Sequence, residues 1–424
     1  ANYVIEVLEF ITEKEGYNYS IKSGDKNKIH LDSLTSYNSF FGEKICHGTL
    51  VLQKTLRLIK IKKHLKNLDQ YFISINFLKH FIYNKTIKLT SKQNMLYQGE
   101  NKIAEINIKK KNYIEKIKKS SFSYKVNDKK YQNMDNFGIL NNLLDFLSKY
   151  VGTVYPGENS IILSIKINFN KKLNFDSKKI FIYSKKIDNK FPIINNKLEY
   201  KNFSISFTSS ERPFFKIKKT KIKKSLINEI KKVKEPVLII GASNGIGHEL
   251  FNLFEYNKKI NIFGTFNKNK FQKKRSNVKL FKLDLKKNFS NLKNYFLKYD
   301  SLRVYYFATP KIDLNDNTKN KICEYKNFYI NYPRKILKMF KNKKIKFFYP
   351  STIFTDINKS HYVRLKKQAE KILNNYDNKD TIISILRIDE IDTKQNLSLI
   401  KKKLPTFSEL LNKSLDYRKK VFFN

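Results

Sequence analysis

The hydrophobic and polar positions in the first half of the chain follow one order twice. After a polar, turn-rich opening, residues 48–61 have the apolar spacing of a helix, and residues 137–150 have that spacing again. Runs with the alternation of β-strands follow each helix. Such runs include 71–77 and 102–108 after the first helix, and 160–169, 179–184 and 203–207 follow the second. We therefore predict two copies of one α+β unit, at residues 1–114 and 115–214.

The pattern changes after residue 214. Residues 215–235 are rich in lysine, and we predict a basic linker there, with a docking strip for an anionic partner as the alternative. From Pro236 onward strands alternate with helices, which is typical of a parallel α/β sheet. Residues 236–424 are therefore predicted to form a doubly wound α/β domain.

Length and charge narrow the class of protein. With 424 residues the chain is long enough for two or three domains. Its net charge of +49 would attract nucleic acid, anionic membranes or acidic proteins, yet the lysines are spread along the whole chain instead of forming one stripe. We expect most of this charge to be solvated surface. Nucleic-acid binding stays an alternative that charge alone motivates.

Cysteine content and hydropathy exclude other classes. Cys46 and Cys323 are the only cysteines, so neither a disulfide framework nor a cysteine zinc cluster is expected, and no metal is predicted. No stretch approaches the roughly 18 apolar residues of a membrane span, and the N-terminal residues lack a signal-peptide pattern. We expect a soluble, cytoplasmic protein.

A glycine-rich turn stands between a predicted strand and a predicted helix near the start of the third block. Residues 237–240 are apolar, and helical spacing covers residues 248–254. Glycines at such a turn let the backbone approach a pyrophosphate, and the N-terminus of the helix supplies amide donors and a positive dipole. The predicted dinucleotide contacts are Gly241, Ser243, Asn244, Gly245, Ile246 and Gly247.

The G-x-x-x-G-x-G spacing of this turn resembles the short-chain dehydrogenase/reductase family, and the resemblance covers residues 236–395. Asp284 matches the family's acidic adenine contact, and Ala308 is the one residue kept from its Asn-Asn-Ala-Gly strand end. The family's catalytic positions fall on Asn331, Ser351 or Thr352, Tyr362 and Lys366. The resemblance implies a Rossmann-type sheet and a nicotinamide-dependent oxidoreductase.

Tyr362 and Lys366 are four residues apart and share one face of a predicted helix. A lysine ammonium beside a phenol favours the phenolate, so we expect a pKa for Tyr362 below its usual value of about 10. The phenol could then donate a proton to a ketone oxygen while hydride reaches the carbon.

Cofactor preference follows from the residues after the second strand of this block, at 261–266. Enzymes that prefer NAD usually need an acidic residue there for the ribose diol, whereas residues 267–270 are Asn-Lys-Asn-Lys. A lysine would attract a 2′-phosphate, so we expect NADP(H) in preference to NAD(H), with Lys268 as the contact. The short sequence after residue 389 leaves little chain for a substrate lid.

Two segments of the first block bring acid–base residues into one region of sequence. Asp25 and His30 lie five residues apart in a polar turn, and Gly48 opens a predicted helix about twenty residues later. A carboxylate and an imidazole can move protons to and from one water, and an amide at a helix N-terminus, here that of Gly48, can stabilise an oxyanion. Alternatively the turn is structural, and His30 and His47 are polar surface or satisfied core residues.

The segments 23–32 and 40–50 resemble the motifs of MaoC-type (R)-specific enoyl-CoA hydratases, which have a hotdog fold. The resemblance implies that Asp25 and His30 hold a water against the double bond of an enoyl thioester. The family commonly has proline where Lys28 stands. The second block resembles a hotdog only through residues 150–160 and lacks an Asp/His pair, so we expect a double hotdog with one active half. His64 and His80 are expected to be structural.

The two resemblances predict a bifunctional enzyme of acyl-thioester metabolism. It would hydrate or dehydrate enoyl and (R)-3-hydroxyacyl thioesters and would reduce 3-ketoacyl thioesters with NADP(H). Its substrates would be carried by coenzyme A or an acyl-carrier protein, and it could form a homo-oligomer. Two further alternatives stay open: a reductase acting on another carbonyl substrate, and a hotdog domain that serves only as an acyl-binding or carrier-docking scaffold.

Overall fold

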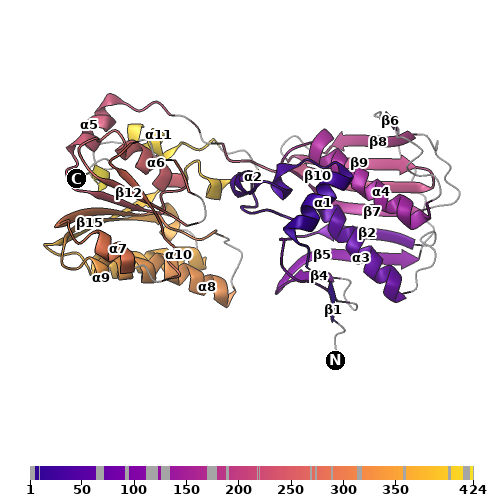
Figure 1. Cartoon of the computed structure of the whole chain (residues 1–424), viewed down its shortest axis with the longest axis horizontal. Helices are drawn as coiled ribbons and strands as arrows, with labels where there is room; N and C mark the ends of the chain where they lie inside the picture. The colour runs from indigo at the N-terminus through magenta and orange to yellow at the C-terminus, as the bar shows by residue number, and fades with distance from the viewer. Residues whose placement is uncertain are drawn as a thin grey trace. The chain divides into compact units, whose positions relative to one another are not determined.

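The computed structural model describes two compact units, residues 1–216 with 397–401 and residues 217–396 with 402–424. Each unit has its own sheet and its own core (Figure 1). No described helix is both long and apolar enough to cross a bilayer. The described residues are 5–8, 10–63, 71–90, 95–110, 123–125, 134–169, 179–187, 191–216, 218, 220–267, 270–272, 275–287, 290–312, 318–356, 360–399, 403–413 and 421–423.

The first unit contains a ten-stranded antiparallel sheet that consists of two equivalent halves. Its strand order is β1-β3-β4-β5-β2-β7-β10-β9-β8-β6, with β2 and β7 as the central pair. From the centre outward, each half presents its second, fifth, fourth, third and first strand. The bounds are Ile5–Leu8 (β1), Tyr71–Phe77 (β2), Ile87–Thr90 (β3), Met95–Gln98 (β4), Asn101–Lys110 (β5), Ser123–Lys125 (β6), Ser160–Phe169 (β7), Lys179–Lys186 (β8), Ile193–Tyr200 (β9) and Phe203–Glu211 (β10).

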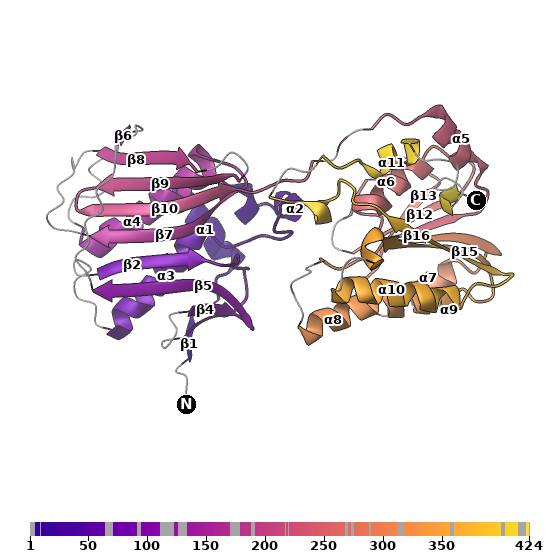
Figure 2. The same ribbon diagram turned by 180° about the vertical axis from the view of Figure 1, so that it is seen from behind.

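The two longest helices of this unit occupy equivalent positions in the two halves. Helix α3 (Gly48–Lys63) precedes β2 and helix α4 (Asn136–Lys149) precedes β7, the equivalent strand. Figures 1 and 2 show both helices, with α1, on one face of the sheet. The inward side chains of β2 and β7, such as Ile75 and Ile165, are completely buried in the shared core. Each half of the sheet therefore combines one long helix with five strands in the same order.

Several elements of this unit were not predicted from the sequence, among them the short strands β1, β3, β4 and β6. The opening segment, expected to be turn-rich, contains helix α1 (Glu13–Ser23). A reciprocal capping box of Thr12 and Glu15 stabilises the N-terminus of this helix. Strand β9 (Ile193–Tyr200) was not predicted, because its polar side chains interrupt the apolar alternation. Among the described residues, the unit also contains three short helical segments: Lys28–His30 (η1), Ser33–Asn38 (α2) and Tyr150–Val154 (η4).

The second unit has a Rossmann-type fold. Its six strands are all parallel in the order β13-β12-β11-β14-β15-β16, which is the 3-2-1-4-5-6 order of dinucleotide-binding sheets. Strands β12 and β13 extend the sheet to one side of β11, and β14, β15 and β16 extend it to the other side. The strand order therefore reverses at β11. The bounds are Val237–Ile240 (β11), Ile262–Phe266 (β12), Val278–Lys282 (β13), Ser301–Tyr306 (β14), Lys344–Thr352 (β15) and Thr381–Ile388 (β16).

Helices cover both faces of this sheet (Figures 1 and 2). One core lies beneath α5, α6 and α11, and the other beneath α7, α9 and α10. The bounds are Lys224–Lys232 (α5), Gly245–Phe254 (α6), Ser290–Tyr295 (α7), Lys319–Lys326 (α8), Asn327–Asn331 (η5), Tyr332–Met339 (α9), Ile353–Asp356 (η6), His361–Asn374 (α10), Lys394–Asn396 (η7) and Phe407–Lys413 (α11).

The structure corrects the prediction of a basic linker at residues 215–235, because this segment contains helix α5. Leu226 and Ile230 of α5 are completely buried, and burial of each such side chain stabilises a fold by about 1.5–3 kcal/mol. The amide of Asn257 donates to the carbonyl of Ile230 at 2.9 Å and holds the end of the helix. The lysines of α5 lie on its other positions, so the charged sequence is one face of an amphipathic helix.

The short C-terminal segment also belongs to this fold. Phe407 and Leu411 of α11 are fully buried in the same core as α6. Phe422 is buried there as well, and its carbonyl accepts a hydrogen bond from the hydroxyl of Tyr305 in β14. These residues therefore cover one face of the sheet.

Candidate active sites

Asp25 stands in a buried position immediately after α1. The helix ends at Gly24, whose left-handed φ of 78° turns the chain, and Asp25 is only 2% exposed. Its Oδ1 accepts a hydrogen bond from the backbone amide of Asn27 at 2.9 Å, and its Oδ2 accepts one from the hydroxyl of Ser148 at 2.7 Å. Both carboxylate oxygens are thus held in fixed directions.

The second half of the sheet contributes directly to this position. Ser148 lies near the end of α4, and Gly152 lies in the following π-helical turn η4. A Cβ atom at Gly152 would lie 2.2 Å from Oδ1 of Asp25, so only glycine permits this approach. The half that lacks an Asp/His pair therefore forms one wall around Asp25, and no sequence pattern indicated these two contacts.

His30 presents one ring nitrogen toward Asp25. It ends the short helix η1, and its Nδ1 lies 2.8 Å from the carbonyl oxygen of Ile45. That contact assigns the proton to Nδ1 and leaves a lone pair on Nε2. Burial lowers the pKa of His30, and the nearby Asp25 carboxylate partly opposes this effect, so the ring is a neutral base.

His47 is a third member of the cluster and was not among the catalytic residues predicted from the sequence. It precedes α3, and its ring stacks on that of His30 with centroids 3.9 Å apart and 27° between the planes. Its Nε2 lies 3.9 Å from Oδ2 of Asp25 and has no hydrogen-bond partner among the described residues. Burial, followed by the His30 ring, lowers the pKa of His47 well below its usual value.

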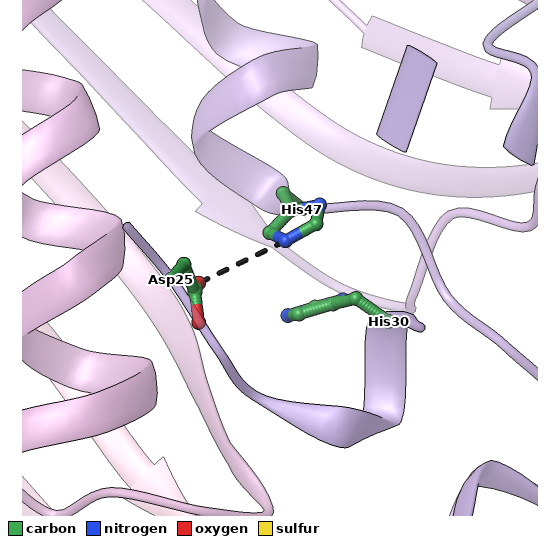
Figure 3. A group of neighbouring side chains, drawn as sticks. All are labelled: Asp25, His30 and His47. Atoms are coloured by element: carbon green, nitrogen blue, oxygen red, sulfur yellow. Dashed lines mark ion pairs between the residues drawn. The ribbon is translucent and has the colours of Figure 1, made fainter. Parts of the chain in front are cut away.

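Figure 3 shows Asp25, His30 and His47 facing one point. One possible ligand atom from each side chain lies within 4.8 Å of the other two. A carboxylate and two neutral imidazoles in this arrangement can accept protons, hold a water molecule or coordinate a cation. Gly48, the predicted oxyanion donor, begins α3 directly after His47, and a Cβ atom there would lie 3.0 Å from the ring of Phe77.

The glycine-rich turn of the second unit lies at the carboxyl end of β11, where the strand order reverses. Gly241 has φ +85°, and a Cβ there would lie 2.7 Å from the backbone nitrogen of Ala308. A Cβ at Gly247 would lie 2.3 Å from the carbonyl oxygen of Gly241. Such a close turn into the N-terminus of α6 fits the diphosphate of a dinucleotide.

The other predicted cofactor residues are placed around this turn or outside the description. Gly245 and Ile246 begin α6 after Ser243 and Asn244, and the Asn244 side chain does not cap the helix. Asp284 follows β13 at the same edge of the sheet, where Oδ1 accepts from the amide of Lys286 at 3.1 Å. Lys268 lies outside the described residues.

Tyr362 lies in the first turn of α10 among other aromatic rings. The side chain of Thr352 lies beside its hydroxyl and partly opposes the effect of burial on its pKa. Its ring meets those of Tyr325 and Tyr329 edge-on, with centroids 6.1 and 5.5 Å away. Burial raises the pKa of Tyr362 to about 12. The expected lowering of this pKa by Lys366 is therefore wrong, because burial dominates and the opposing contribution comes from Thr352.

Lys366 is buried one helical turn beyond Tyr362. Its Nζ donates to the carbonyl of Pro350 at 2.6 Å and lies 4.5 and 4.6 Å from the ring centroids of Tyr329 and Tyr349. Burial lowers the pKa of Lys366 to about 7, with the Glu370 carboxylate partly opposing this. Burial therefore disfavours the phenolate form of Tyr362, and it also disfavours the ammonium form of Lys366 that was expected to stabilise this phenolate.

The remaining predicted positions differ in their partners. The hydroxyl of Ser351 donates to Glu370, whose carboxylate also pairs with Arg387 at 2.9 Å. The hydroxyl that meets Tyr362 belongs instead to Thr352. Asn331 ends the π-helical turn η5, and its amide donates to the side chain of Asn327 at 2.8 Å. Such turns within helices occur frequently at functional sites.

No protein-family model and no curated protein matches the chain. Among solved structures, a short-chain dehydrogenase family protein from Francisella tularensis is similar over 38% of this chain and 71% of its own, with 18% identity and a TM-score of 0.32. UDP-glucuronic acid 4-epimerase from Bacillus cereus in complex with NAD is similar over 37% of this chain and 56% of its own, with 17% identity and a TM-score of 0.31. A thiolation-reductase di-domain from an archaeal non-ribosomal peptide synthetase is similar over 39% and 57%, with 13% identity and a TM-score of 0.30.

Proposed function

We propose that the first unit adds water to, or removes it from, an acyl thioester, and that the second unit is an NADP(H)-dependent short-chain reductase. The observation that carries the first assignment is the convergence of Asp25, His30 and His47 on one buried point. A helix on an antiparallel sheet, repeated with identical connectivity, supports a double hotdog for this unit.

The chemistry of the first site needs only a proton relay. Asp25 and the lone pair on Nε2 of His30 would hold one water, and its oxygen would add to the β-carbon of an enoyl thioester. The proton that leaves the water passes through this pair to the α-carbon, so the elements of water add and nothing is oxidised. The amide of Gly48 would stabilise the charge that develops on the thioester oxygen. Dehydration follows the same steps in reverse.

In the second unit, the turn at Gly241 and Gly247 and the N-terminus of α6 would hold the dinucleotide, which supplies hydride when bound. Tyr362, with its pKa of about 12, keeps its proton at neutral pH and can donate it to a substrate oxygen. Thr352 lies against the same hydroxyl and would orient it. The absence of an acidic residue in 267–270 supports NADP(H).

These two activities would form one sequence, in which a 3-ketoacyl thioester is reduced and the 3-hydroxyacyl product is dehydrated. The test is to incubate the purified full chain with a short 3-ketoacyl-CoA and NADPH and to identify products by mass. We expect hydroxyacyl and enoyl species from the unmodified chain. Tyr362→Phe should abolish both, and Asp25→Asn only the enoyl product.

Matched variants control for general damage. Asp32→Asn changes a carboxylate in the same segment that caps α2, and Tyr256→Phe changes an exposed tyrosine; both should form both products. Hydroxyacyl product alone from the unmodified chain would leave the first unit as an acyl-binding or carrier-docking scaffold. Failure to oxidise NADPH with any 3-ketoacyl thioester would favour a different carbonyl substrate for the reductase.

A further inference from the structure

The cluster of Asp25, His30 and His47 has the composition of a metal site. Two imidazoles and one carboxylate form a ligand set that proteins use for first-row divalent metals. We infer that these three residues bind a divalent transition-metal ion of the Zn²⁺ type. This binding does not depend on the reaction proposed for the unit.

The separations suit such an ion. Bonds of about 2.0–2.2 Å to zinc place neighbouring ligand atoms about 3–4 Å apart, and His47 Nε2 lies 3.9 Å from Asp25 Oδ2. All three ligand atoms lie within 4.8 Å of one another. Because the imidazole rings are stacked, one of them must turn to aim both lone pairs at the same ion. His47 can make this turn without losing a hydrogen bond at Nε2, since that atom has no partner among the described residues.

The surroundings orient the ligands as a metal site requires. His30 holds its Nδ1 against the carbonyl of Ile45, and a ring nitrogen engaged in this way fixes the tautomer whose other nitrogen binds metal. Asp25 is fixed by the hydroxyl of Ser148 and the amide of Asn27. Hydrogen bonds of this kind, from neighbouring groups to the ligand side chains, keep the ligands of a metal ion in position.

Charge provides a second argument. Asp25 is buried, and no lysine or arginine of the described chain lies within ion-pair distance of it. A buried carboxylate without a cation is unfavourable, and it is stabilised by coordination or by hydrogen bonds. Two neutral imidazoles leave the cluster with a net negative charge, which a divalent cation would reverse.

Metal binding has a consequence that rests on the proposed function. The ion would use the lone pairs of Asp25 and His30 that are proposed to hold the reacting water. Dehydration would therefore stop while the reductase in the other unit continued, and the hydroxyacyl thioester would accumulate. Zinc would act as an inhibitor that a chelator removes.

The experiment uses the chelator-treated full chain without substrate. Zn²⁺ is titrated by calorimetry and Co²⁺ by its visible absorption, which reports the ligand geometry. We expect one ion per chain, and that ion should be lost in His47→Asn and Asp25→Asn. Ser148→Ala, which removes only an outer contact, should weaken binding by roughly 10–100-fold. His80→Asn removes a histidine of the same unit outside the cluster and should leave the affinity unchanged.

Other outcomes overturn the inference. Equal zinc affinity in the unmodified chain, His47→Asn and Ser148→Ala would assign the ion to adventitious surface groups, and no binding at all would exclude the site. Thermal unfolding in chelator shows whether each variant is folded. If a variant of a ligand residue does not fold, the affinity of Ser148→Ala for zinc still tests the inference. Dehydration in chelator without zinc binding contradicts only this inference, whereas zinc binding without dehydration contradicts only the proposed function.

Discussion

Gly152 lies against the carboxylate of Asp25, so closely that a Cβ atom at this position would lie 2.2 Å from Oδ1. The two residues come from different halves of the ten-stranded sheet, and Ser148 adds a hydrogen bond from the same side. The geometry of Asp25 is therefore set jointly by both halves.

The first prediction concerns this contact. Gly152→Ala should displace Asp25 and lower the proposed dehydratase activity by about 100-fold or more, because small misplacements of a catalytic group have effects of this size. Overpacking should also destabilise the first unit by about 1–3 kcal/mol. Enoyl formation from a 3-hydroxyacyl-CoA and urea unfolding measure the two effects. Gly138→Ala, whose nearest neighbour is the side chain of Asp135, is the matched control. Unchanged dehydration in Gly152→Ala would show that Asp25 is not required in this position.

The second prediction separates the two adjacent hydroxyls at the proposed reductase site. Thr352 contacts Tyr362, whereas Ser351 is bound to Glu370. Tyr362→Phe should lower kcat by about 10²–10⁴-fold, the usual contribution of a general acid. Thr352→Val should lower kcat more than Ser351→Ala does, when NADPH oxidation is followed with a 3-ketoacyl-CoA. The reverse order would assign the substrate-side hydroxyl to Ser351.

The third prediction follows from the buried Lys366. Its pKa is about 7 in the folded protein and about 10.4 in an unfolded chain, so between these values the unfolded state binds more protons. The free energy of unfolding therefore rises with pH in this window, by at most about 1.4 kcal/mol per pH unit for one proton. Below about pH 7 the lysine is protonated in both states and adds no slope.

Lys366→Met removes this titration. Urea unfolding of the second unit near neutral pH and again about two pH units higher should show a larger gain for the unmodified chain than for Lys366→Met. Lys367→Met, which changes the adjacent exposed lysine, should retain the gain. Parallel pH dependence in all three proteins would mean that Lys366 keeps its ordinary pKa.

The fourth prediction concerns the turn before α6. Gly247→Ala would place Cβ 2.3 Å from the carbonyl of Gly241, which forces the turn open. We expect nucleotide binding, followed by the fluorescence of NADPH, to weaken by at least about tenfold, equivalent to 1.4 kcal/mol. Ser243→Ala keeps the backbone of the turn and should have a smaller effect. Full NADPH affinity in Gly247→Ala would move the nucleotide site away from this turn.

Local patterns were sufficient where one strand or helix carried its own signal. The alternation in β2 and β7 and the apolar run of β11 predicted the bounds seen in the structure. Strand β9 escaped prediction because Asn195, Lys197 and Glu199 make it polar on one face, while Asn196 is buried in a hydrogen-bond network on the other. Helix α1 has few apolar residues, and its capping box was the signal that could have found it.

The candidate sites show a sharper limit. The spacing of Asp25 and His30 suggested a pair, but Ser148 lies 123 residues from Asp25 in sequence, and no local pattern links them. His47 stood next to the predicted Gly48, yet only the stacked rings reveal its place in the cluster. The direction in which the pKa of Tyr362 shifts depends on burial. Burial cannot be read from the four-residue spacing between Tyr362 and Lys366.

The central pairing of β2 with β7 constrains how the two repeats can evolve. Residues 72–76 of β2 pair with residues 164–168 of β7, so either repeat alone would expose an apolar strand edge that favours aggregation. The second repeat has no Asp/His pair of its own, but its sequence is constrained by this pairing. Because Ser148 and Gly152 set the position of Asp25, a substitution in the second repeat also changes the geometry of the cluster in the first.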